Sequence, residues 1–205
     1  MNQQAKLLLN PFERFSERTL LSWGILSLVI GSIIAFTVHG KFDGVLDLHF
    51  GPHVQWYGPF LDNLINIFSL MIPLMIVGRI VNNKTRIIDV LTTILIARIP
   101  FYLLVLFNVN NFMEDLTNRM MSQFQGSVPG RSFGVENLGV GPWEMLLFIV
   151  FAMLSILVLI WMITLLYRGF KTATNIKSAP HIVMFSVAII IAEIISKIIF
   201  SNLNY

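Results

Sequence analysis

Five long apolar runs, separated by short polar segments, constrain this chain more than any other feature of its sequence. A helix needs about 20 mostly apolar residues to cross the hydrocarbon core of a bilayer. The chain is 56% hydrophobic and 12% charged, against about 25% charged residues in soluble domains. The runs do not alternate as barrel strands do, so they predict helices. We expect an all-α, polytopic transmembrane helix bundle with spans at Thr19–Val38, Tyr57–Ile80, Ile87–Phe107, Trp143–Leu166 and Pro180–Phe200.

The distribution of Lys and Arg predicts the orientation of these spans. With the N-terminus inside, the inner segments hold 9 of the 14 basic residues, the outer segments hold 3, and 2 lie within spans. Cytoplasmic loops carry the excess of positive charge. We therefore expect residues 1–18 to be a cytoplasmic N-terminal segment and residues 19–205 a five-helix transmembrane domain whose C-terminus lies outside.

The longest segment between spans is the predicted outer loop at residues 108–142. Apolar residues recur near helical spacing in its first half, which predicts an amphipathic helix on the membrane surface or capping the bundle. They are Phe112, Met113, Leu116, Met120 and Phe124. The second half, Gly126–Gly141, is rich in Gly and Pro and is expected to be irregular.

Charged and amide side chains inside the spans are the first candidates for function, because each ion costs about 2.5 to 3.5 kcal/mol to insert. With a rise of 1.5 Å per residue, Arg98 lies roughly 15 Å and Glu193 roughly 19 Å from the inner end of its span. Asn66 falls at a similar level. These three residues predict an intramembrane polar layer near the midplane, which either fixes helix order or takes part in transport or binding.

A second, outer polar layer is predicted closer to the external face. Asp62 and Asn63 open the second span, Glu144 opens the fourth, and Lys197 lies near the end of the fifth. Lys197 is also four residues from Glu193, on the same helix face. Alternatively, its long side chain extends to the membrane interface.

Proline and small residues predict the shape of the spans. Pro73 and Pro100 each remove a backbone hydrogen bond, so we expect helix kinks at both. Small residues recur every fourth position at Ser27, Gly31 and Ala35, and again at Ala188, Ala192 and Ser196. Such stripes allow close helix approach, either within the chain or in a homodimer.

The sequence offers little that indicates catalysis or a bound metal. It has no Cys, no hydrolase or metalloprotease motif, and no phosphate-binding glycine loop. The first outer loop carries His39, His49 and His53 with two Asp residues, but Gly51-Pro52 breaks any helix that would space metal ligands regularly. We therefore predict no enzyme activity, no cofactor and no metal.

Two segments of the chain resemble bacterial members of the Yip domain family. They are TRIIDVLTTILIARIPFYLLVLFNV, with its Ala97-Arg98-Ile99-Pro100 element, and LLYRGFKTATNIKSAPHIVMFSVAIIIAEIISKII. The resemblance implies five spans, a cytoplasmic N-terminus and a place in the bacterial inner membrane. Eukaryotic members of that family include Rab-interacting proteins of the secretory pathway, whereas no established catalytic residues carry over.

Two functions follow from these observations. The first is a non-enzymatic membrane-organising or adaptor protein, whose partners are the lipid bilayer and other membrane proteins or a second copy of itself, and not nucleic acid. The alternative is a small transporter or channel that uses Arg98 and Glu193 along its path. A water-filled cavity reaching the midplane favours the alternative, and a dry, paired layer favours the adaptor.

Overall fold

The computed structural model describes residues 8–52, 54–125, 139–176 and 178–203, and the side chains of Phe124 and Gln125 lie outside this description. Within these ranges, five helices are long and apolar enough to cross a membrane, which confirms the all-α bundle of five spans. The elements are η1 Pro11–Glu13, α2 Glu17–Thr37, β1 Gly40–Lys41, β2 His49–Phe50, α3 Gly58–Val81, α4 Ile87–Ala97, α5 Ile99–Tyr102, η2 Leu103–Asn111, α6 Phe112–Gln125, α7 Pro142–Thr174 and α8 Ala179–Ser201.

The ends of the spans follow local capping chemistry. The first helix begins two residues before the predicted Thr19, because the Ser16 hydroxyl accepts the backbone N–H of Thr19 and caps α2. The fourth helix continues past the predicted Leu166 to Thr174 and ends where Asn175 takes a left-handed conformation, with φ of 58°.

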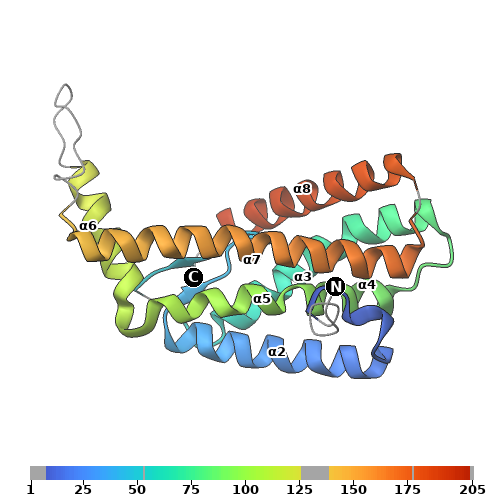
Figure 1. The fold of residues 1–205 in the computed structure, drawn as a ribbon, viewed down its shortest axis with the longest axis horizontal. Helices are drawn as coiled ribbons and strands as arrows, with labels where there is room; N and C mark the ends of the chain where they lie inside the picture. Colours follow the sequence, from blue (N-terminus) through green and yellow to red (C-terminus); the bar gives the residue numbers. More distant parts are fainter. Residues whose placement is uncertain (1–7, 53, 126–138, 177, 204–205) are drawn as a thin grey trace.

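The third span lies at the centre of the bundle. Helix α4 packs against α2, α3 and α7, and α8 packs along α3 (Figure 1). Two glycines of α2 constrain this packing. A Cβ at Gly24 would lie 2.6 Å from Leu95 Cβ, and one at Gly31 would lie 2.5 Å from Tyr102 Cγ. The small-residue stripe of α2 therefore packs closely against the third span. The α8 residues Ala188, Ala192 and Ser196 are likewise buried within the chain.

The two prolines have different consequences. The third span is broken at Arg98, whose carbonyl accepts the N–H groups of Phe101 and Tyr102 beyond Pro100. Helix α3, by contrast, runs from Gly58 to Val81 without a break at the buried Pro73.

The two ends of the bundle differ in what connects the helices. One end, called the hairpin end here, holds β1, β2 and α6, together with the start of α3 and α7 and the end of α2 and α8 (Figure 1). The opposite end, called the η1 end, holds η1 and the connections α3–α4 and α7–α8.

A helix occupies the first half of the segment 108–142, where α6 buries Met113 and Leu116. The expected contribution of the Phe124 side chain and most of the irregular stretch Gly126–Gly141 fall outside the described residues.

Candidate functional site

The connection between α2 and α3 is a short hairpin that enters the bundle, where the sequence predicts only an outer loop. Strands β1 and β2 pair antiparallel, with Gly40 opposite Phe50 and Lys41 opposite His49. Residues 42–48 connect the two strands and lie between the helices. They are called the inserted tip here. Phe42 and Val45 of the tip are both 0% exposed. A backbone segment without regular pairing in this setting needs partners for its N–H and C=O groups.

Helix α3 binds the beginning of the inserted tip. The backbone N–H of Phe42 donates to Asp62 Oδ2 at 3.0 Å, and Asn66 Nδ2 donates to the Phe42 carbonyl at 2.6 Å. Asp62 and Asn66 are one helical turn apart, so both reach the same residue. One face of α3 thus satisfies both backbone groups of Phe42.

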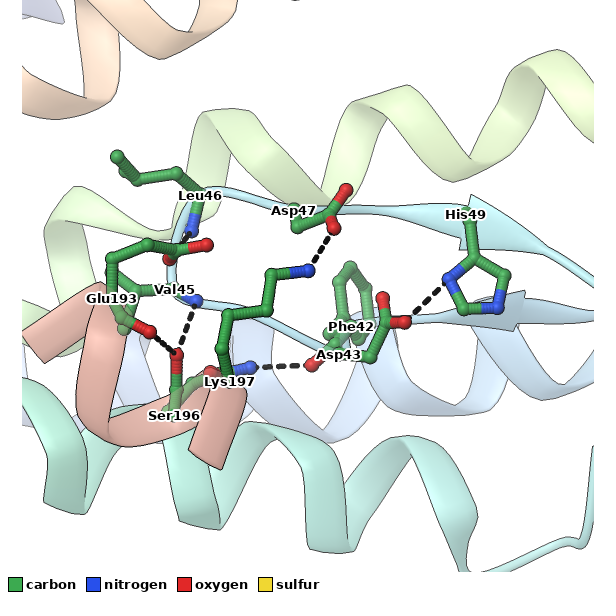
Figure 2. Close-up of polar contacts among 10 residues, drawn as sticks. Phe42, Asp43, Val45, Leu46, Asp47, His49, Glu193, Ser196 and Lys197 are labelled. Carbon is green, nitrogen blue, oxygen red and sulfur yellow. Dashed lines mark hydrogen bonds and ion pairs between the residues drawn. The ribbon is translucent and has the colours of Figure 1, made fainter. Parts of the chain in front are cut away.

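Helix α8 and the third span bind the middle of the tip. Arg98 Nη1 donates to the carbonyl of Val45 at 3.2 Å, and the N–H of Leu46 donates to Glu193 Oε2 at 2.9 Å. The N–H of Val45 donates to the hydroxyl of Ser196 at 3.3 Å. Figure 2 shows Glu193 and Ser196 directed from α8 toward Val45 and Leu46. Residues from two spans therefore bind one peptide unit of the tip.

Arg98 is fully buried, at 0% exposure, although it carries a charge. Its Nη2 donates to Asn63 Oδ1 at 3.0 Å, and Asn63 in turn donates to Ser32 Oγ and the Pro59 carbonyl, each at 2.9 Å. The guanidinium carbon lies 5.6 to 5.9 Å from the ring centres of Phe42, Phe101 and Tyr102, within cation–π range. Among the described residues Arg98 Nε has no hydrogen-bond partner. Arg98 thus contacts a backbone carbonyl, an amide side chain and three aromatic rings.

The structure arranges the residues of the two predicted layers differently from the sequence prediction. Asn66, Arg98 and Glu193 all bind the tip, but no ion pair joins Arg98 and Glu193 among the described residues. Asp62 and Asn63 belong to the same network as these three. The sequence prediction, which rests on depth along each span, assigns Asp62 and Asn63 to a separate outer layer because it takes no account of the intervening tip.

The other two residues of the predicted outer layer lie apart from each other. Lys197 pairs with Asp47 at the end of the tip, rather than with Glu193 one turn away (Figure 2). Glu144 pairs with Arg119 of α6, at 2.6 Å, and accepts the N–H of Gly141 at 2.8 Å. Glu144 thus ties α6 to the start of α7.

A charged cavity of about 340 Å³ opens beside the hairpin. Its lining includes Lys41, Asp43, His49, Asp62 and Lys197. His49 Nδ1 lies 2.6 Å from Asp43 Oδ2. This hydrogen bond raises the pKa of His49 above its usual value despite partial burial. Burial opposes the shift at Asp43, yet the same bond and the charge of His49 lower the pKa of that carboxyl.

The described residues do not gather three or more potential metal ligands at one point, and His53, the third histidine of the predicted cluster, lies outside the described residues. His39 lies 3.5 Å from Glu114 of α6, away from the pair made by His49. The two described histidines of this loop therefore serve separate contacts.

Sequence reasoning missed Ser196 as a ligand of the tip, and it missed the role of the tip itself. One signal was present: Leu46, Leu48 and Phe50 alternate with Asp47 and His49, as in a half-buried strand. Polar residues on the facing sides of the second and fifth spans were a second signal for a polar segment between them.

The fold and this network define a helical membrane protein with an inserted hairpin, since five apolar helices fit an integral membrane protein. Neither a scan against protein-family models nor searches of curated proteins and solved structures gave a match.

Proposed function

We propose that the chain is a non-enzymatic membrane-organising or adaptor protein of the Yip type, acting through contacts with other membrane proteins. The observation that supports it is the use of the intramembrane polar groups. Asn66, Arg98 and Glu193 bind backbone groups of the inserted tip. Their hydrogen bonds explain their presence in lipid without a transported substrate.

The surroundings of Arg98 support the same proposal. A permeation path needs water or polar groups along its length. Arg98 is wholly buried among three aromatic rings and does not line the charged cavity at the hairpin end. Asn66, Arg98 and Glu193 thus each have a partner within the chain, as a scaffold requires.

The proposed location is the bacterial inner membrane, with the η1 end in the cytoplasm. Among the described residues, the η1 end carries Arg14, Arg18, Arg79, Lys84, Arg86, Arg168 and Lys171, whereas the hairpin end carries Lys41, Arg119 and Lys197. This asymmetry supports the orientation through the positive-inside rule.

A transporter or channel is the second candidate, and the charged cavity at the hairpin end favours it. That cavity reaches Asp62, which is only 2% exposed and bonds to the same tip as Arg98. Movement of the tip would join the cavity to the Arg98 network.

Flux through proteoliposomes separates the two candidates. The purified protein is reconstituted and tested with ions and small solutes, beside Arg98→Ala and the exposed, matched control Arg79→Ala. The adaptor proposal predicts no flux above empty vesicles for any of the three proteins. Flux in the native protein and in Arg79→Ala that disappears in a folded Arg98→Ala protein would overturn it.

A further inference from the structure

The N-terminal segment before α2 is fixed against α7 at the η1 end. Trp161 Nε1 donates to the Leu8 carbonyl at 2.9 Å. A Cβ at Gly169 would lie 2.7 Å from Phe12 Cζ, so the absence of a side chain at Gly169 lets the Phe12 ring pack onto α7. The short helix η1 is therefore held across α7 between Trp161 and Gly169.

Three cavities border this segment, and two of them together form an elongated candidate site. An apolar groove of about 510 Å³ has Leu8, Phe15, Trp23, Ile99, Trp161 and Leu165 in its lining. A polar cavity of about 520 Å³ lies beyond it and is lined by Asn10, Glu13, Tyr167, Arg168, Lys171, Thr172 and Asn175. The residues of η1 and its flanks contribute to both.

A single stripe of α7 runs from the groove to the polar cavity. Trp161 and Leu165 line the groove, and Arg168 and Thr172 line the polar cavity. At 100° per residue these four positions fall within an arc of about 60°, and Arg168 lies about 10 Å along the axis from Trp161. An apolar surface thus leads directly to cationic side chains over a distance that suits a lipid glycerol and phosphate.

The charges of the polar cavity set the class of ligand. Arg168 and Lys171 supply two positive charges and Glu13 one negative charge, a net charge of +1 (2 − 1). Arg168 and Lys171 have no ion-pair partner among the described residues. The buried Oδ1 of Asn10 likewise has no hydrogen-bond partner within that part of the chain. A phosphodiester with one negative charge and a hydroxyl-bearing headgroup complements all of these groups.

From this arrangement we infer that the η1 end binds one molecule of an anionic glycerophospholipid of the phosphatidylglycerol class. The phosphate lies against Arg168 and Lys171, a headgroup hydroxyl donates to Asn10, and an acyl chain occupies the groove beside Trp161. The inference does not rest on the proposed function, because an adaptor and a channel could hold the same lipid.

Native mass spectrometry of the detergent-purified full chain tests the site with phosphatidylglycerol, phosphatidylethanolamine and phosphatidylcholine as separate probes. We expect one phosphatidylglycerol to be retained in preference to the other two. Arg168→Ala/Lys171→Ala should weaken its retention about thirtyfold. This factor assumes that each basic residue near an anionic lipid surface contributes its usual binding free energy of about 1 kcal/mol. Arg79→Ala/Lys84→Ala is the matched control, since it removes two exposed cations from the same end outside the cavity.

Two further experiments test whether the acyl chain, and not the phosphate alone, is bound. Ile99→Trp, which fills the groove, should weaken retention, whereas Ile30→Trp on the exposed face of α2 should not. Glycerol phosphate in excess should not displace the lipid, since it lacks the acyl chain. Equal retention of all three lipids, equal losses in the two double variants, or displacement by glycerol phosphate would each overturn the inference.

Discussion

Arg98 and Glu193 bind opposite sides of one peptide unit: Arg98 donates to the Val45 carbonyl at 3.2 Å, and Glu193 accepts the Leu46 N–H at 2.9 Å. Two oppositely charged side chains from separate spans are thus connected through neutral backbone. This arrangement places a hairpin, rather than a direct ion pair, between the third and fifth spans.

Replacing Arg98 should destabilise the protein more than replacing an exposed arginine. Arg98→Leu leaves the Val45 carbonyl and Asn63 Oδ1 without their donor in a buried setting. We expect a loss of about 2 to 4 kcal/mol from these two unpaired groups. Arg79→Leu, at an exposed position, should change stability by less than about 0.5 kcal/mol. Thermal unfolding in detergent measures both, and equal shifts for the two variants would contradict the assigned role of Arg98.

Gly31 should tolerate no side chain, because a Cβ there would lie 2.5 Å from the Tyr102 ring. Gly31→Ala is expected to destabilise the chain by about 1 to 3 kcal/mol through overpacking. Gly51→Ala is the control, since the nearest atom to a Cβ there is 3.9 Å away. The same unfolding assay compares them. Unchanged stability in Gly31→Ala would show that α2 does not pack closely against Tyr102 of the third span.

The pair formed by His49 and Asp43 should be pH-dependent. The pKa of His49 is raised by its bond to Asp43, so this stabilisation is complete below the unfolded-state pKa and is lost as pH rises through the folded-state pKa. The pKa of Asp43 is lowered in the folded state, so the contribution of this carboxylate to the free energy of unfolding is lost as pH falls through its folded-state pKa. The pair is therefore strongest between the two folded-state values.

A titration of the His49 ring by nuclear magnetic resonance tests this pair. In Asp43→Asn the His49 midpoint should fall below that of the native protein, because the carboxylate that favours the imidazolium is gone. His39→Gln, which removes a histidine elsewhere, should leave it in place. An unchanged His49 midpoint in Asp43→Asn would refute the pairing.

The sequence was sufficient for the spans and insufficient for the segment between the first two. Span positions depend on runs of apolar residues long enough to cross lipid, which are visible in one dimension. The inserted tip depends on Asp62, Asn66, Arg98, Glu193 and Ser196 meeting the backbone of a loop, which no spacing rule specifies. Depth counting brought Asn66, Arg98 and Glu193 to similar levels, yet it separated Asn63 from Arg98, although the two are hydrogen-bonded.

The two prolines also show which features the sequence predicts and which it does not. Pro100 was expected to disturb the third span, and the helix breaks two residues before it, at Arg98. Pro73 carries the same local chemistry, yet α3 continues through it from Gly58 to Val81 with the proline buried. The outcome at each proline depends on tertiary packing as well as on the missing N–H.

Thiol labelling tests the central claim, that the polar groups of the spans hold a dry, inserted tip. The chain contains no Cys, so a single introduced thiol reports on one position. Val45→Cys in the tip should resist a membrane-impermeant maleimide, whereas His49→Cys, at a half-exposed position, should react. Adding Arg98→Ala should make the thiol at position 45 reactive, since the tip loses its central donor. Reaction of Val45→Cys as fast as His49→Cys with Arg98 intact would contradict the claim.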